Sequence, residues 1–70
     1  MVEVYKTNIQ TKYQCKDIIR IMLKYNPLYK INFDLKDCDR VLRIEAVSVN
    51  SKDVILLFAE CGFECEVLPD

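Results

Sequence analysis

The chain has 70 residues, of which 51% are hydrophobic and 30% are charged, and its formal net charge is −1. This composition is typical of one small globular domain spanning 1–70, and it excludes an intrinsically disordered chain. Histidine is absent, which removes the commonest general base and metal ligand, and the single glycine, Gly62, excludes a glycine-rich phosphate loop. The chemically distinctive residues are four cysteines: Cys15, Cys38, Cys61 and Cys65.

The first part of the chain predicts a strand followed by a helix. Residues 2–7 are rich in β-branched and aromatic types, as strands are. Thr11 and Gln14 have the spacing of a capping box at the start of a helix. Asn26 ends that helix, because a residue before proline avoids helical dihedral angles. Between them, apolar residues recur with the spacing of one helix face: Cys15, Ile18, Ile19, Met22 and Tyr25.

The second part predicts a hairpin, a helix and a closing strand. Residues 31–35 alternate between apolar and polar side chains, 36–39 are polar and turn-like, and 41–46 form the returning strand. Asn50 or Ser51 can cap the second helix, which extends over 54–61 and ends at Gly62. Because this helix is apolar almost all round, we expect it to be well buried. Residues 63–68 alternate again and form the last strand.

The order β-α-β-β-α-β predicts an α+β, ferredoxin-like sandwich: a four-stranded antiparallel sheet with both helices on one face. In this topology the first two strands run the same way. The loop after the first strand, the hairpin turn and the loop after the second helix therefore emerge at one end. Each cysteine lies in or beside one of these connections, so all four thiols are expected toward that end.

The same sequence gives an expectation for the cellular compartment. No basic leader precedes an apolar stretch, and the longest apolar run covers only 54–59. A bilayer span needs about 20 residues. We therefore expect a soluble, cytoplasmic protein with reduced thiols. A disulfide framework is the alternative for an even number of cysteines, but only Cys61 and Cys65 lie close in the sequence and no secretory signal accompanies them.

Three segments of the chain match the pattern of a known domain family. Cys15 followed by Ile19 and Leu23 is similar to a metal-binding cysteine and the helix behind it. Residues 31–35 and 41–44 look like the second and third strands of that family, and 54–63 resemble its second helix with the terminal glycine–aromatic pair. Over nearly its whole length, the chain thus resembles the heavy-metal-associated domains, the small copper-chaperone fold.

The resemblance implies a function in metal handling. Members bind soft metals through M-x-C-x-x-C in the loop before the first helix, since two thiolates three positions apart suit Cu(I). Here Gln10 stands at the methionine position and Lys12 at the first cysteine, so Cys15 alone is retained. The implied site would hold Cu(I) or Zn(II) through Cys15 and other thiols, with Cys61 and Cys38 as the further candidates. The alternative is a metal-free protein-interaction module that keeps the fold.

Cys15 is the strongest single candidate for a reactive thiol. It lies near the start of a predicted helix, between Lys12 and Lys16, and both surroundings lower a thiol pKa. Cysteine is also often buried as a small apolar residue. The alternative is therefore an inert Cys15 at the head of the apolar stripe, with redox chemistry as a third possibility for the set of thiols.

Charge is divided unevenly along the chain. Residues 1–30 carry six basic and two acidic side chains, whereas 31–70 carry four basic and nine acidic ones. Four of the basic residues recur at every fourth position of the first helix: Lys12, Lys16, Arg20 and Lys24. Complementary charge orients protein partners, and the chaperones that this chain resembles are thought to dock around this helix. We expect a protein partner on this face, and a solvated face without a partner is the alternative.

Other functional classes fit less well. Without histidine or a Ser-His-Asp set we expect no enzyme. Residues 41–46 lack the aromatic side chains on which RNA-recognition domains stack bases, so no nucleic-acid partner is expected, and no membrane partner either. Asp37 and Asp39 flank Cys38 and could suggest a site for a hard cation such as calcium. The segment lacks the glycine and the ligand spacing of a calcium loop, so we do not expect such a site. Glu64 and Glu66 place negative charges on the last strand and disfavour its edge-to-edge pairing with a strand of another chain, so we expect a monomer.

Overall fold

The computed structural model describes residues 1–69 and has the predicted order of elements. The strands are β1 (Val2–Thr7), β2 (Lys30–Asp34), β3 (Val41–Glu45) and β4 (Cys65–Val67), and the helices are α1 (Lys12–Tyr25) and α2 (Ser51–Glu60). The last strand is shorter than predicted, because the chain after α2 turns before it joins the sheet.

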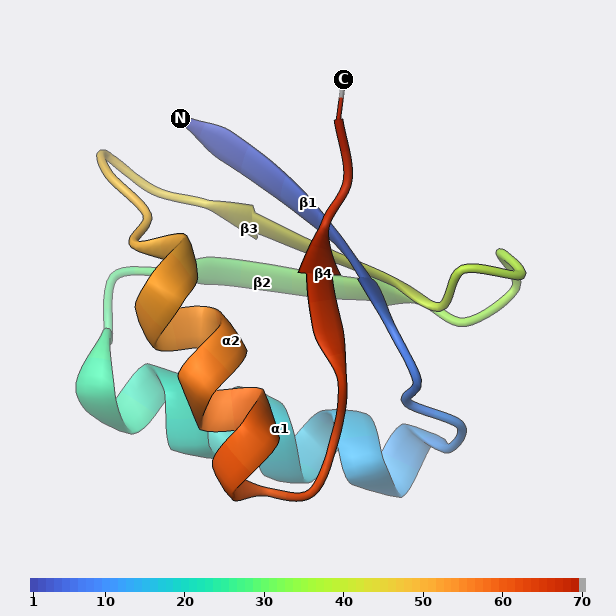
Figure 1. Ribbon diagram of the computed structural model, residues 1–70. Coiled ribbons are helices and arrows are strands. Elements are labelled where there is room, and N and C mark those ends of the chain that lie inside the picture. The colour runs from blue at the N-terminus through green and yellow to red at the C-terminus, as the bar shows by residue number, and fades with distance from the viewer. Residues whose placement is uncertain (70) are drawn as a thin grey trace.

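The strands form one antiparallel sheet in the order β2-β3-β1-β4, and both helices cover the same face of it (Figure 1). This confirms the ferredoxin-like α+β fold. In the central pair, Tyr5 lies opposite Leu42, and Phe33 lies opposite the same residue from β2. This register brings apolar side chains of three strands together under the helices.

Local signals set the ends of both helices, although α2 begins at Ser51, earlier than the predicted start at residue 54. The Gln14 N–H donates to Thr11 Oγ1 at 3.1 Å, and Gln14 Oε1 accepts from the Thr11 N–H at 3.2 Å, so the capping box is complete. At α2, Asn50 is the cap, and its Oδ1 accepts from the Asp53 N–H at 3.3 Å. Gly62 follows α2 with φ of +85°, the left-handed conformation that glycine adopts most easily.

The core lies between the sheet and the helices. Its buried side chains are Tyr5, Ile9, Cys15, Ile18, Met22, Leu42, Ile44, Val54 and Phe58. The expectation that α2 is buried almost all round is wrong. Val54 and Phe58 face the core, but Leu56 is 58% exposed and Ile55 is 37% exposed. Residues 1–69 form one layer of helices, and within this range no element covers the side of α2 that faces away from the sheet (Figure 1).

Candidate functional site

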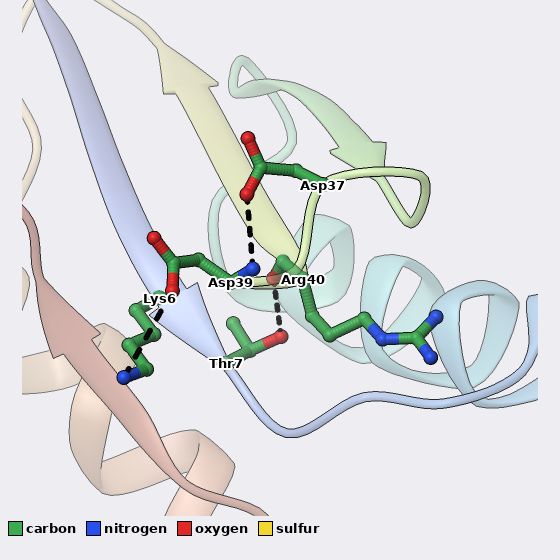
Figure 2. A network of polar contacts seen from close by, with 5 residues as sticks. All are labelled: Lys6, Thr7, Asp37, Asp39 and Arg40. Carbon is green, nitrogen blue, oxygen red and sulfur yellow. Dashed lines mark hydrogen bonds and ion pairs between the residues drawn. The ribbon is translucent and has the colours of Figure 1, made fainter.

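Three loops meet where β1 ends, as the topology predicts. The Thr7 N–H donates to Asp39 O at 3.1 Å. Thr7 Oγ1 also donates to Arg40 O at 2.6 Å (Figure 2), so the β2–β3 turn is held against β1. The Glu64 N–H donates to Asn8 Oδ1 at 2.8 Å, which joins the α2–β4 loop to the loop after β1. These hydrogen bonds confirm that the three connections share one end of the sheet.

The β2–β3 turn carries the exposed thiol, Cys38, between two aspartates. Asp37, Cys38 and Asp39 have potential ligand atoms within 4.8 Å of one another, the one such group of three found among residues 1–69. A thiolate with two carboxylates falls within the ligand types of Zn(II). Both carboxylates also serve the turn: Asp37 Oδ1 accepts from the Asp39 N–H at 2.9 Å, and Asp39 Oδ1 pairs with Lys6 Nζ at 3.9 Å (Figure 2).

Arg40 completes this turn with a left-handed backbone, at φ of +48°. Its N–H donates to Asp37 O at 3.0 Å, and its Nη1 donates to Leu35 O at 3.0 Å. Left-handed dihedral angles are costly for a residue with a side chain. These hydrogen bonds, with the one from Thr7, hold the residue in that conformation. Together with the hydrogen bond to the Asp37 carboxylate and the ion pair of the Asp39 carboxylate, these contacts give the turn a structure that needs no metal.

Cys15 lies in the core, where it is only 7% exposed and shares a face of α1 with Ile18 and Met22. Burial raises the pKa of its thiol above the ordinary value, although a backbone hydrogen bond acts in the opposite direction. The expectation of a lowered pKa is therefore wrong. Lys12 and Lys16 project into solvent while the thiol is turned inward, and the loss of hydration outweighs the favourable charge at the helix start.

Cys61 and Cys65 are half-buried and pack against the core. Cys61 ends α2, and Cys65 begins β4 opposite Thr7. Burial raises the pKa of the Cys65 thiol to about 12. Within residues 1–69 all four cysteines are free, and the predicted set of Cys15, Cys38 and Cys61 does not form a group of neighbouring ligands. One thiol faces solvent and three lie on or in the core.

The predicted basic face of α1 is exposed along its whole length. Its members, all of them exposed to solvent, are Lys12, Lys16, Arg20 and Lys24. Arg20 Nη2 pairs with Asp17 Oδ1 at 3.1 Å, and among the residues described, the three lysines make no ion pair. Three cationic groups on this face therefore have no anionic partner within the described part of the chain.

A groove between α1 and α2 is a feature that sequence reasoning missed. It has a volume of about 480 Å3. Its lining residues come from the end of α1, the following loop and one side of α2: Met22, Tyr25, Asn26, Tyr29, Asp53, Val54, Leu56, Leu57 and Glu60. The signal for it was the surplus of apolar residues in α2. More of them are present than one core-facing side can bury, so the remainder line a solvent-facing surface.

Comparisons with known proteins add no assignment. A scan against protein-family models, a search of curated proteins and a search of solved structures each find no match to this chain. The resemblance to heavy-metal-associated domains thus stays a prediction based on the residues that carry it. Separately, no helix within residues 1–69 has both the length and the apolar character needed to cross a membrane.

Proposed function

We propose that this protein is a metal-free protein-interaction module that binds an acidic surface of a partner protein through the basic face of α1. The observation that carries the proposal is the exposure of four basic residues on one helix: Lys12, Lys16, Arg20 and Lys24. Of these four, Arg20 is the one that forms an ion pair within the described part of the chain. Charge of one sign on a rigid face steers and orients a partner of the opposite sign.

The opposite side of α1 makes this face rigid. Ile18 and Met22 are almost completely buried in the core, and the capping box at Thr11 holds the start of the helix. The basic groups therefore project from a fixed backbone. The ion pair of Arg20 with Asp17 is solvent-exposed. Because such pairs contribute only about 0–1 kcal/mol, a partner carboxylate can replace Asp17 at low cost.

The burial of the thiols supports the metal-free form of the proposal. A thiolate is the metal-binding state of cysteine, and burial opposes ionisation of Cys15 and Cys65. Lys12 occupies the position at which the family that the chain resembles has its first ligand, and an ammonium group repels a metal cation. Four free thiols fit a reducing, cytoplasmic location, which is part of this proposal.

Metal handling is the second candidate, and the turn at Cys38 is the observation that favours it. This thiol is exposed, and the flanking carboxylates place three potential ligands within 4.8 Å. Mixed sulfur and oxygen donors fit Zn(II) better than Cu(I), which prefers soft ligands. On this interpretation the ligand would be Cys38, and the buried Cys15 would take no part.

Charge reversal tests the docking face. The variant Lys16→Glu/Lys24→Glu changes α1, and Lys36→Glu/Lys52→Glu is the matched control, with the same change in net charge at exposed positions elsewhere. Chemical crosslinking followed by quantitative mass spectrometry compares the proteins captured by each form. We expect acidic proteins that the wild type and the control capture and the α1 variant does not. Equal capture by all three forms would contradict the proposal.

A metal titration separates the two candidates. Reduced protein is titrated anaerobically with Cu(I) or Zn(II) against a competing chelator, as wild type, Cys15→Ser and Cys38→Ser. The metal-free proposal expects no binding tighter than that of glutathione. Tight binding that is lost in Cys38→Ser would establish the second candidate instead. Tight binding that is lost in Cys15→Ser would contradict the argument from burial.

A further inference from the structure

The groove between α1 and α2 exposes apolar side chains at its edges. Tyr25 is 71% exposed and Leu56 is 58% exposed, whereas Met22 and Val54 below them are buried. Its volume of about 480 Å3 lies within the range of ligand sites, about 300–1,000 Å3. An exposed apolar surface bordered by polar groups is typical of an interaction site. A ligand with an apolar side chain would remove these edges from water.

The charge of the groove restricts the ligand further. Asp53 and Glu60 are the only charged residues in its lining, and within residues 1–69 neither carboxylate takes part in an ion pair. Lys24 is adjacent to Tyr25 in the sequence but does not line the groove. The groove is therefore negative, and its charge is opposite to that of the basic face of α1. It favours a cationic ligand.

The walls of the groove are held in place before any ligand binds. The Asn50 N–H donates to the Tyr29 hydroxyl at 3.4 Å, and the Tyr29 N–H donates to Asn26 O at 3.1 Å. Asn50 is also the cap of α2. These contacts join the loop after α1 to the start of α2 at one end of the groove. A preformed site avoids much of the ordering cost of binding.

We propose that this groove binds a short segment of a partner protein in which an apolar side chain stands next to Lys or Arg. The apolar side chain packs on Leu56 and Leu57, and the cationic group pairs with Asp53 or Glu60. The exposed Tyr25 ring offers a face for the same cation, an interaction favoured by aromatic side chains. This site is separate from the basic face, and it takes a ligand of the opposite charge.

A second copy of this chain is a poorer ligand for the groove. In a two-fold symmetric dimer the same patch is used by both copies. Asp53 and Glu60 of one copy would then approach the same carboxylates of the other, with no basic residue in the lining to offset them. Like charges across an interface are unfavourable. Compared with such a two-fold contact, the charge of the lining therefore favours a cationic segment of another protein.

Selection from a random peptide library displayed on phage provides the probe. The library is selected on immobilised wild-type protein, and the enriched peptides are synthesised and measured by fluorescence anisotropy. We expect one class of these peptides to combine an apolar residue with Lys or Arg, and acidic peptides, which the basic face of α1 would bind, to form a separate class. The affinity of peptides that combine an apolar residue with Lys or Arg should fall by about tenfold in Leu56→Ser, because the variant removes most of the leucine side chain that the bound peptide would cover. Glu60→Gln should weaken binding in a salt-dependent manner.

Two matched controls make the test specific to the groove. Ile55→Ser changes an exposed apolar residue of α2 that does not line the groove, and it should leave the affinity unchanged. Lys16→Glu/Lys24→Glu reverses two charges on the basic face and should not weaken binding, so a failure of the function proposed for α1 is distinguishable from a failure here.

Several results would overturn the proposal. These are a selection that yields no peptide combining an apolar residue with Lys or Arg, or peptides of that kind that bind Leu56→Ser as tightly as the wild type. Circular dichroism of each variant checks that the fold is retained. Sedimentation of the wild type and Leu56→Ser tests the remaining alternative. A wild-type dimer that the substitution converts to a monomer would assign the groove to a second copy.

Discussion

Substitution of Cys15 tests whether this thiol is a packing residue or a reactive group. The side chain is 7% exposed and lies against the apolar core. In Cys15→Ser a hydroxyl replaces the sulfur, and burying a hydroxyl without a hydrogen bond costs about 1–3 kcal/mol in proteins. Thr11 O, which accepts from the Cys15 N–H at 3.2 Å, lies one turn back and can also accept from a serine hydroxyl. We therefore expect the free energy of unfolding to fall by about 1–2 kcal/mol.

Urea unfolding followed by circular dichroism, with a reducing agent present, measures this change. In thermal unfolding of the same variant, each kcal/mol would correspond to a decrease of about 4–8 °C in Tm for a domain of this size. The matched control is Cys38→Ser at an exposed position, where the change should stay within about 0.5 kcal/mol. Labelling of the native protein with a thiol reagent should modify Cys38 much faster than Cys15. An unchanged unfolding midpoint in Cys15→Ser, together with equal labelling rates, would refute the assignment of Cys15 to the core.

Three further predictions concern stability. The Cys65 thiol stays protonated in the fold, whereas the same thiol ionises near pH 9 in the unfolded chain. The free energy of unfolding should therefore decrease from about pH 9 toward pH 12. The decrease should be smaller in Cys65→Ala, and urea midpoints across this pH range measure the difference. Thr7→Val leaves Arg40 O and the Ile9 N–H without the Thr7 hydroxyl and should lower the free energy of unfolding by about 2 kcal/mol in urea titrations. In Gly62→Ala the added Cβ would have no atom within 4 Å, so the change costs only the left-handed backbone of an alanine. The free energy of unfolding, measured by thermal unfolding, should fall by about 1 kcal/mol.

Features that depend on neighbouring residues could be predicted from the sequence. The capping box at Thr11 and the end of α2 at Gly62 are set within one helical turn, and alternation over 31–35 and 41–46 identifies the hairpin. The order of the strands alone predicts that three loops lie at one end of the sheet: the loop after β1, the β2–β3 turn and the α2–β4 loop. The reason is that the directions of the strands fix which strand ends lie together.

Features that depend on packing between distant segments could not be predicted in the same way. The position of Cys15 at a helix start suggests a lowered thiol pKa, but its burial depends on how α1 packs against the sheet. Likewise, the apolar composition of α2 does not reveal which of its sides lacks a covering element. The groove beside Leu56 and Leu57 lies between α1 and α2, and neither helix sequence encodes that arrangement by itself.

Aspartates beside a cysteine are ambiguous for a different reason. Carboxylates that accept hydrogen bonds in a turn and carboxylates that ligate a metal can have the same spacing. In the structure, Asp37 accepts from the Asp39 N–H, and Asp39 pairs with Lys6 on β1, a residue far away in the sequence. Contacts of this kind favour a structural role for the turn, and the one between Lys6 and Asp39 joins residues that are distant in the sequence.

Lys12 belongs both to the predicted resemblance to heavy-metal-associated domains and to the basic face of α1. It stands at the position of the first cysteine in the family that the chain resembles, and it is also the first of the four cations on α1. If the loop before α1 retains the geometry of a two-thiol site, Lys12→Cys restores the spacing that Cu(I) prefers, with Cys15 as the second ligand. Metal coordination would then offset the cost of ionising a buried thiol.

We expect Lys12→Cys to compete with a chelator for Cu(I) where the wild type does not, and Lys12→Cys/Cys15→Ser to lose that ability. Anaerobic titration measures both, and Lys16→Cys is the matched control, since it adds an exposed thiol at a spacing that does not form the motif. Equal Cu(I) binding by Lys12→Cys and Lys16→Cys would indicate that the resemblance does not extend to the loop geometry. Stronger binding by Lys12→Cys alone would indicate that a single substitution separates this chain from a metal-binding domain, because the fold around the position remains suited to two thiolates.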